Sequence, residues 1–526
     1  MNTKARMARD AGTLLLSRLA EGVISFVFSA WTVRLVSKEE LSLWPVLGLL
    51  AGFSASLAGL GLPMAGVRLI PAHLARGERK EAARILRTSL ALHASFLFAL
   101  CVVLVMGSRL VSRLMLKTDD YSVAVAMLAP GMFFGALGTH LGFYLQATGG
   151  FRQISINLIV RGLATAIAAP PLYLWLGWKG VPLALALGPF LSSTLALLYL
   201  RRLVWGVREF EPAGSLVRFS SSYWGTSLIT FAHTNADFLL LGVLTSPKQM
   251  APYFVAYRFI AYLFELSHAA LTVASRRVAE LQVAGQARVE AAFTKTSRYL
   301  FVVLLPVYAG VAGLSWPLIT LYAGGKYPQA IAILAALCVY AFMTLFFGMY
   351  RLNIWVRARP VETLRLQTVS TILMLGLTAG GVALWGGMGA AVGQTAALVA
   401  ASLVGWRSLR RLIKIQYDVA ALRTATLATA AMLAVVLTPQ LLSRHPAAVI
   451  AYALCGALTY FCLVAPAIRE EDTDLIRGVV PKVAFEPLVG LIRRLGGAKP
   501  AQGEPRQATP AQPSRAEGTL DGTTLR

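Results

Sequence analysis

Long apolar runs, separated by short polar connections, fill most of the chain. A bilayer core about 30 Å thick requires about 20 mostly apolar residues to cross it as a helix. Runs of that length recur about fourteen times, and they begin near Ala11, Leu41, Ile85, Tyr121, Ile154, Val181, Phe219, Met250, Ser297, Ala330, Leu364, Met388, Ala421 and Pro446. Because no large polar domain interrupts them, the pattern predicts an all-α integral membrane protein.

Basic residues concentrate in every second connection between these runs. With the N-terminus placed in the cytoplasm, the inner connections hold about three times as many Lys and Arg residues as the outer ones. This bias is typical of cytoplasmic loops in membrane proteins. It predicts that both termini are cytoplasmic, since an even number of spans returns the chain to its starting side.

A shift of about 209 residues superposes several features of the chain on one another. Arg68 falls on Arg277, and Arg79 falls on Arg288. Regular helix spacing alone is the alternative explanation. A true duplication predicts two parallel six-helix repeats, since an even number of spans gives both copies the same direction through the membrane. We therefore expect lobes over 1–210 and 211–415, transmembrane helices 13 and 14 over 416–470, and a cytoplasmic tail over 471–526, disordered after about residue 496.

Composition excludes several classes of function. The chain is 57% hydrophobic and 14% charged, and its net charge of +25 lies in the connections, which argues against nucleic acid as a partner. The four cysteines lie inside apolar runs without the spacing of a disulfide framework or metal site. Gly324-Gly-Lys326 is followed by Tyr327 and lacks the spacing of an ATP-binding loop. We expect no metal, no cofactor and no use of ATP.

Ionisable residues inside the apolar runs are candidates for function, because each costs a few kcal/mol at the centre of a membrane helix. Those on the first, seventh and eighth runs share helix faces or stripes, and one more lies on the fifth run: Arg18, Glu21, His233, Asp237, Arg258, Glu265 and His268, with Arg161 on the fifth. Plainer interpretations exist for some. Arg18 is close enough to the cytoplasmic end to extend into the lipid headgroups, and His233 with Asp237 is consistent with a structural pair. His93 and His140 are expected in the core.

Four short segments resemble the polysaccharide flippases of bacteria. They are Arg34-Leu-Val-Ser-Lys-Glu-Glu-Leu-Ser-Leu-Trp44, Gly59-Leu-Gly-Leu-Pro63 with Arg68 shortly after, Asp237-Phe-Leu-Leu-Leu-Gly242 and Tyr253-Phe-Val-Ala-Tyr-Arg258. The likeness extends over roughly residues 11–414. This Wzx-like family belongs to the multidrug/oligosaccharidyl-lipid/polysaccharide exporter superfamily, which also holds multidrug and toxin extrusion antiporters and lipid II flippases.

The resemblance implies two lobes that rock about a central cavity in the bacterial inner membrane. It implies a cargo of polyprenyl-pyrophosphate-linked oligosaccharide, with membrane lipids, a polysaccharide polymerase and export machinery as partners. For that cargo, Arg18, Arg161, Arg258 and Glu265 are the substrate-binding candidates. Glu21, His233, Asp237 and His268 are candidates for balancing charge or for coupling to a proton or sodium ion.

Three other functions compete with this one. The lipid II branch carries an Arg-Asp pair in its first span, whereas Ile24-Ser25 occupies that position here, after a matching Ser17-Arg18. A multidrug antiporter for cations would favour an acidic cavity, whereas several arginines occur here. A membrane polymerase or ligase commonly has a large outer loop that carries catalytic residues, and the longest outer connection, residues 107–120, is short.

Overall fold

The computed structural model describes residues 3–207, 209–282, 286–357, 360–409, 417–442 and 445–467. Regular structure within these ranges is helical, and they contain no strand. The chain divides into two compact units, Met1–Leu458 and Thr459–Arg526. The expected cytoplasmic tail over 471–526, with its disordered end, lies outside the described residues.

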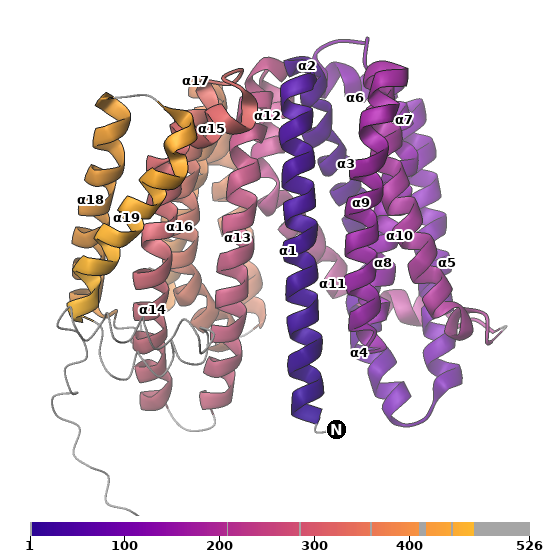
Figure 1. Ribbon diagram of the computed structural model, residues 1–526. Coiled ribbons are helices and arrows are strands. Elements are labelled where there is room, and N and C mark those ends of the chain that lie inside the picture. The colour runs from indigo at the N-terminus through magenta and orange to yellow at the C-terminus, as the bar shows by residue number, and fades with distance from the viewer. Residues whose placement is uncertain are drawn as a thin grey trace, which may run out of the picture. The chain divides into compact units, whose positions relative to one another are not determined.

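The first part of the larger unit is a bundle of long helices joined by short turns (Figure 1). Helices form here because every backbone N–H and C=O must find a partner within the segment when lipid surrounds it. The elements are α1 (Thr3–Leu35), α2 (Lys38–Leu41), α3 (Leu43–Ala58), α4 (Leu62–Ala75), α5 (Arg79–Met106), α6 (Ser108–Val111), the π-helix η1 (Ser112–Leu116), α7 (Ser122–Met127), α8 (Ala129–Ala147), α9 (Phe151–Leu176), η2 (Gly177–Lys179) and α10 (Gly180–Val204).

A second set of helices follows and packs mainly within itself. It comprises α11 (Ala213–Thr234), α12 (Ala236–Leu244), α13 (Pro247–Gln282), α14 (Gln286–Gly313), α15 (Ser315–Ala323), α16 (Gln329–Arg357) and α17 (Pro360–Leu409). The larger unit continues through α18 (Val419–Leu442), which packs on α14, then η3 (Pro446–Ala448) and most of α19 (Val449–Val464). The described part of the smaller unit contains the end of α19 and η4 (Ala465–Ala467).

Within the described ranges, nine helical segments are long and apolar enough to cross a membrane. Two of them are far longer than one crossing requires: Phe151–Arg201 has 51 residues and Leu364–Arg407 has 44. At 1.5 Å per residue, these correspond to about 75 Å and 65 Å of helix, enough for two crossings each. A polytopic helical membrane fold is therefore confirmed, whereas the count of fourteen spans stays a prediction, as do the lobe limits at residues 210 and 415.

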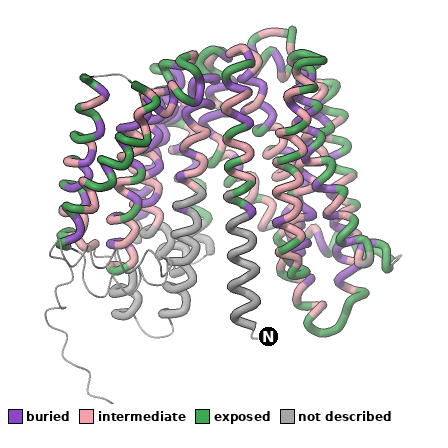
Figure 2. Tube along the Cα trace, viewed as in Figure 1, coloured by how far each residue is buried: buried purple, intermediate pink, exposed green. Residues whose placement is uncertain are grey.

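Large apolar side chains cover the outside of the larger unit, as Figure 2 shows for the exposed positions of its helices. Val103 is 64% exposed, Trp175 is 80% exposed and Met106 is 82% exposed. In water such a surface would drive aggregation. The surrounding solvent that fits it is the hydrocarbon of a bilayer.

Two of the hydrophobic clusters in the larger unit bear on how its helices are held together. One lies mainly within the first bundle, where it includes Leu86, Leu141 and Tyr144, and it extends to Leu216 of α11. The other joins the two sets of helices, because Val33 of α1 and Leu49 of α3 pack in the same cluster as the apolar side chains of α12, α13, α15 and α16. Figure 1 shows α2, α12 and α15 at one end of the unit, which we call the α2 end.

Two of the breaks in the helical path lie at Gly61 and Gly386. Between α3 and α4, Leu60 and Gly61 have φ values of 48° and 70°. Within α17, Trp385 departs from helical geometry and Gly386 has φ 56° and ψ −128°. Positive φ favours glycine because glycine has no Cβ to clash with the backbone. The second break separates the predicted eleventh and twelfth spans.

Candidate functional site

The two sets of helices meet in several places, among them α11 on α3 and α4 and α13 on α1, and a guanidinium group lies in the contact between α13 and α1. Arg258 of α13 donates from Nη2 to Ser25 Oγ at 2.8 Å, to the Ser25 carbonyl at 3.0 Å and to Ser29 Oγ at 3.2 Å. Its Nε lies 3.3 Å from the same Ser29 oxygen. Arg258 is half-buried. All of these partners are neutral oxygens, so the contact orients the guanidinium without cancelling its charge.

Aromatic rings surround this arginine and complete the seam between α1 and the second set of helices. Tyr322 of α15 donates from its hydroxyl to Ser29 Oγ at 2.7 Å, and Tyr262 of α13 donates to the Gly22 carbonyl at 2.9 Å. Phe26 packs between them, with ring centroids 5.0 Å from Tyr322 and 5.6 Å from Tyr262. The absence of a side chain at Gly22 allows this approach, since a Cβ there would lie 3.2 Å from the Tyr262 ring.

Further cations close the α2 end of the same seam. Arg34, at the end of α1, donates from Nε to the Tyr322 carbonyl at 3.2 Å and also binds the Leu321 carbonyl. Lys326, in the turn between α15 and α16, binds the Val36 carbonyl. Burial lowers the pKa of the Lys326 ammonium from its usual value. These bonds run between the two sets of helices in both directions and hold this end shut.

Arg161 and Glu21 form an ion pair between α9 and α1. Arg161 donates from Nε at 3.1 Å and from Nη2 at 2.5 Å to Glu21 Oε1. The arginine side chain is 44% exposed and the glutamate 18%. Arg18, expected on one face of α1 with Glu21, is exposed. The carboxylate of Glu21 therefore neutralises an arginine of another helix, a pairing that the spacing on α1 did not predict.

The break at Asn235 separates His233 from Asp237. We expected these residues four apart on one face of a continuous helix, but α11 ends at Thr234, α12 begins at Ala236, and the two axes differ by 60°. His233 lies 3.5 Å from Thr371 Oγ1 of α17 through its Nδ1. Asp237 is buried and accepts from the Tyr253 hydroxyl at 2.7 Å, while its Oδ1 has no hydrogen-bond partner among the described residues. The shared face is thus wrong, because Asn235 is not helical.

Glu265 and His268 lie on α13, seven and ten residues beyond Arg258, but their side chains lie outside the described residues. Of the eight candidates, Arg161 and Glu21 are in contact with each other. Arg258, His233 and Asp237 each have other partners.

Sequence reasoning missed the hydroxyl groups that hold Arg258. Ser25 and Ser29 are four residues apart on α1, and Gly22 precedes Ser25 by one turn. Such a stripe of small residues is a recognised sign of close helix contact in membranes. It identifies the face of α1, but it does not identify Arg258 as the partner.

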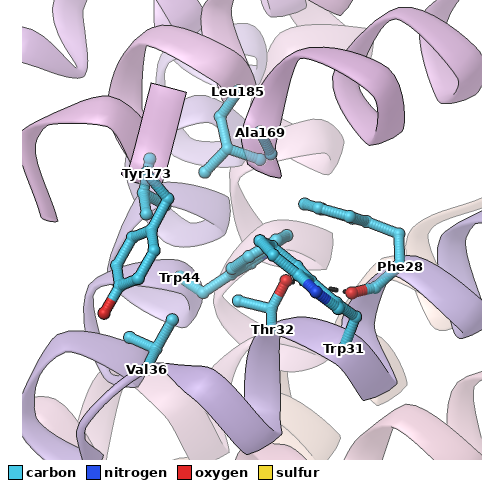
Figure 3. Close-up of a pocket in the computed structure, with 9 residues that line it drawn as sticks. Phe28, Trp31, Thr32, Val36, Trp44, Ala169, Tyr173 and Leu185 are labelled. Atoms are coloured by element: carbon cyan, nitrogen blue, oxygen red, sulfur yellow. Dashed lines mark hydrogen bonds between the residues drawn. The ribbon is translucent and has the colours of Figure 1, made fainter. Parts of the chain in front are cut away.

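A separate small pocket lies between α1 and helices α3, α9 and α10 (Figure 3). Its lining comes from α1, α3, α9 and α10 and includes Phe28, Trp31, Trp44 and Tyr173. Figure 3 shows mainly aromatic and aliphatic side chains around it, and no charged residue contributes to the lining. The space is too small for an acyl or prenyl chain, so the pocket is a packing gap beside α1 and not a cargo site.

The sequence from residue 33 to residue 332 matches the family model described as polysaccharide biosynthesis protein, which is more than half of the chain. The chain belongs to this family. A search of curated protein sequences gives no significant match.

Solved structures with the same fold are transporters of the MOP superfamily. The lipid II flippase MurJ, in an inward closed conformation, superposes with a TM-score of 0.69 at 13% identity, over 86% of this chain and 98% of that one. An inward-facing multidrug resistance MATE transporter superposes with a TM-score of 0.60 at 16% identity, over 74% and 94%. A MOP superfamily transporter from Pyrococcus furiosus gives 0.52 at 17% identity, over 77% and 94%. At these identities the likeness shows the fold.

Proposed function

We propose that this member of the polysaccharide biosynthesis family is a flippase. Its cargo is an oligosaccharide repeat unit linked to a polyprenyl pyrophosphate, which it moves across the bacterial inner membrane by alternating access. The polymer made from these units is an O-antigen, a capsule or an exopolysaccharide. The family match and the fold shared with a lipid II flippase and with MATE transporters support a transporter.

The observation that carries the proposal is the charge of Arg258. A pyrophosphate brings about two negative charges, which cannot enter hydrocarbon without compensation. Arg258 lies where the two sets of helices meet, and its hydrogen-bond partners are neutral oxygens. Its positive charge is therefore available to an anion, and a guanidinium presents donors in a planar fork that matches phosphate oxygens.

The remaining candidates have supporting roles in this proposal. Arg18 and Arg161 contact pyrophosphate or sugar together with Glu265. Glu21 balances Arg161 while no cargo is bound, because the two are already paired. Asp237, with an unpartnered buried oxygen, is the candidate for a coupling proton or sodium ion, and His233 and His268 are further candidates for that role.

Two other cargoes remain as alternatives. Lipid II is disfavoured by Ile24-Ser25 in place of the Arg-Asp pair of that branch, since Ser25 here serves as an acceptor for Arg258. A cation-coupled drug antiporter is disfavoured by Arg258, which lies at the contact between the lobes and has no carboxylate partner among the described residues. The superpositions on MurJ and on a MATE transporter show a common fold and do not choose between these cargoes.

Deletion of the gene tests the proposal. We expect loss of surface polysaccharide and accumulation of undecaprenyl-linked oligosaccharide on the cytoplasmic leaflet. Normal surface polymer with altered tolerance to drugs or cations would assign the protein to the antiporter branch, and loss of viability with accumulated lipid II would assign it to peptidoglycan synthesis. Co-purification with a polysaccharide polymerase, in the same strain background, tests the expected partnership.

The orientation of the chain belongs to the same proposal. The excess of basic residues in alternate connections supports cytoplasmic termini. In that orientation the seam around Arg34 faces the periplasm, so the closed α2 end is the outer gate. A membrane-impermeant thiol reagent added to whole cells should label Asp120→Cys, in an outer turn, and should leave Lys80→Cys unlabelled. The reverse labelling would invert the assignment.

A further inference from the structure

Four polar side chains lie buried together inside the first bundle, away from the seam between the lobes. Ser89 and His93 are one turn apart on α5, and His140 and Tyr144 are one turn apart on α8. None of the four is more than 1% exposed. The two imidazole rings stack face to face, with centroids 4.0 Å apart and planes 8° apart. A core of pure packing has no need of four polar groups, since buried polar groups carry a desolvation cost.

The contacts of the two His93 nitrogens define which nitrogen carries the hydrogen and which can take up a proton. Nδ1 lies 2.9 Å from the carbonyl oxygen of Ala58, and Nε2 lies 3.4 Å from the carbonyl oxygen of Ala136. A carbonyl oxygen only accepts, and a neutral imidazole has one N–H. The shorter contact therefore holds the hydrogen on Nδ1, and the lone pair of Nε2 faces the Ala136 oxygen. One added proton on Nε2 converts that opposed pair into a second hydrogen bond.

The partner ring is arranged differently. His140 Nε2 lies 3.2 Å from Ser89 Oγ, which also bonds the Tyr144 hydroxyl. His140 Nδ1 is buried and has no hydrogen-bond partner in the part of the chain that the structure describes. Two positive imidazoliums stacked 4.0 Å apart would repel strongly in a dry interior, so the pair has room for one proton. His93, with a carbonyl oxygen at each nitrogen, is the ring built to hold it.

The surroundings contain no countercharge among the residues that the structure describes. Tyr144 of α8 is the titratable side chain in contact with the pair. From α3 the pair receives the backbone of Ala58, and α4 places Gly66 against Tyr144. On α5 the nearest cation is Arg87, whose guanidinium binds the Val207 carbonyl and stacks on Phe210.

Helices α10 and α11 also pack on α5, and their described cations lie apart from the pair. Arg218 of α11 is exposed, and the described cation of α10, Arg201, is exposed on the last turn of that helix. In these described surroundings, the charge of the pair therefore depends on whether a proton is bound to it.

His93 is connected to the second set of helices through a short stretch of backbone that begins at the Ala58 carbonyl. Ala58 ends α3, where a helix leaves its last carbonyl oxygens without intrahelical partners. Side chains from other helices take these oxygens: Trp224 Nε1 donates to Leu57 at 3.1 Å, His93 takes Ala58, and Ser220 Oγ donates to Leu60 at 2.7 Å. Trp224 and Ser220 belong to α11, the first helix of the second set.

The same stretch is the break between α3 and α4. Gly61, with φ 70°, packs directly on the α11 backbone, because a Cβ there would lie 2.8 Å from the Trp224 nitrogen. A change in the hydrogen bond to the Ala58 carbonyl therefore acts on the α3–α4 break. The carbonyls of Leu57 and Leu60 on either side are bound by α11 of the other lobe.

We propose that the stacked His93–His140 pair is a binding site for a single transported or regulatory proton, and that its occupancy biases the relative position of the two lobes through the α3–α4 break. On protonation, His93 Nε2 gains a hydrogen and donates to Ala136, while Nδ1 keeps Ala58. This inference rests on the proposed alternating access of the lobes but not on the identity of the cargo. It adds a proton site in the first bundle to the candidates of the second.

Distance measurements between spin labels test the proposal. Labels on Lys80→Cys and Leu364→Cys, both exposed and at the starts of α5 and α17, report the separation of the lobes in nanodiscs. The four native cysteines are replaced by alanine in this background. Between pH 8 and pH 5 we expect the ratio of the two distance populations to change about tenfold, with the steepness of one proton.

Substitutions assign that proton. His93→Asn keeps an amide donor near Nδ1 without a titrating nitrogen and should reduce the change to less than about twofold; His93→Gln is the second variant if the first does not fold. His140→Gln should keep the change and move its midpoint. His445→Gln, in an exposed connection, should behave as the unsubstituted chain does.

Three outcomes would overturn the proposal: a separation that ignores pH in the unsubstituted chain, a full response in both His93 variants, or a response abolished by His140→Gln alone. Each leaves the deletion phenotype unaffected, so failure of the proton site and failure of the flippase assignment are distinguishable.

Discussion

Arg258→Ala removes the charge on which the proposed cargo binding depends. Truncating one member of a hydrogen-bonded charge pair costs about 2–5 kcal/mol. Because Arg258 is half-buried, we take the lower limit, and at about 1.4 kcal/mol per decade this corresponds to about 30-fold slower transport. Arg258→Lys keeps the charge but replaces the planar fork by a point charge, so an intermediate loss is expected.

The same substitution should change folding much less. Ser29 Oγ retains the Tyr322 hydroxyl as a donor and the Phe26 carbonyl as an acceptor. The lost bonds to hydroxyl and carbonyl groups then lower the free energy of unfolding by about 1–2 kcal/mol. Protein abundance in the membrane should therefore remain near that of the unsubstituted chain.

The assay is complementation of the deletion strain. Surface polysaccharide and the accumulated lipid-linked intermediate are measured together with the amount of protein in the membrane. Arg109→Ala is the matched control, since Arg109 is an exposed arginine of α6 far from the seam along the chain. Unchanged export in Arg258→Ala would refute the binding role, and a parallel fall in abundance would assign Arg258 to folding.

Three further predictions concern other positions. Glu265→Ala should reduce polymer export in the same assay with nearly unchanged abundance; wild-type export would remove Glu265 from the site. The single changes Arg161→Glu and Glu21→Arg should each lower export, and the double swap should recover part of it. The coupling energy should be up to about 1 kcal/mol, because Arg161 is 44% exposed. No recovery would mean that the pair has no functional role. Gly61→Ala should lower membrane abundance and the melting temperature more than Gly77→Ala. Both residues have positive φ, but an alanine side chain at Gly61 overlaps α11, whereas one at Gly77 enters open space. Equal effects would show that the contact of α11 with the break contributes little.

The hydropathy and charge patterns of the sequence alone were sufficient to predict the class of protein. Lipid forces each crossing to be a helix, so a one-dimensional pattern of apolar runs predicts the helical membrane fold. Short motifs such as Gly59-Leu-Gly-Leu-Pro63 identified the family, because a break such as the one at Gly61 is a local backbone requirement that leaves its residues in the sequence.

The site depended on contacts between helices distant in the chain. Arg258 meets Ser25 across 233 residues and Arg161 meets Glu21 across 140. The amphipathic pattern of a helix gives its faces but not which face of which other helix covers them. Spacing also failed at Asn235, because a break that rotates α12 by 60° moves Asp237 off the face it would share with His233.

The sequence by itself determined that this protein is a polytopic helical membrane protein of the polysaccharide biosynthesis family, since those properties follow from local apolar content and short motifs. Tertiary structure alone decided which charges are compensated: Arg161 is neutralised by a carboxylate, whereas Arg258 is held by hydroxyl groups. It also decided that two histidines of separate helices stack. The physical reason is that electrostatic energy depends on distances of a few ångströms between side chains, and only the packing of the helices sets those distances.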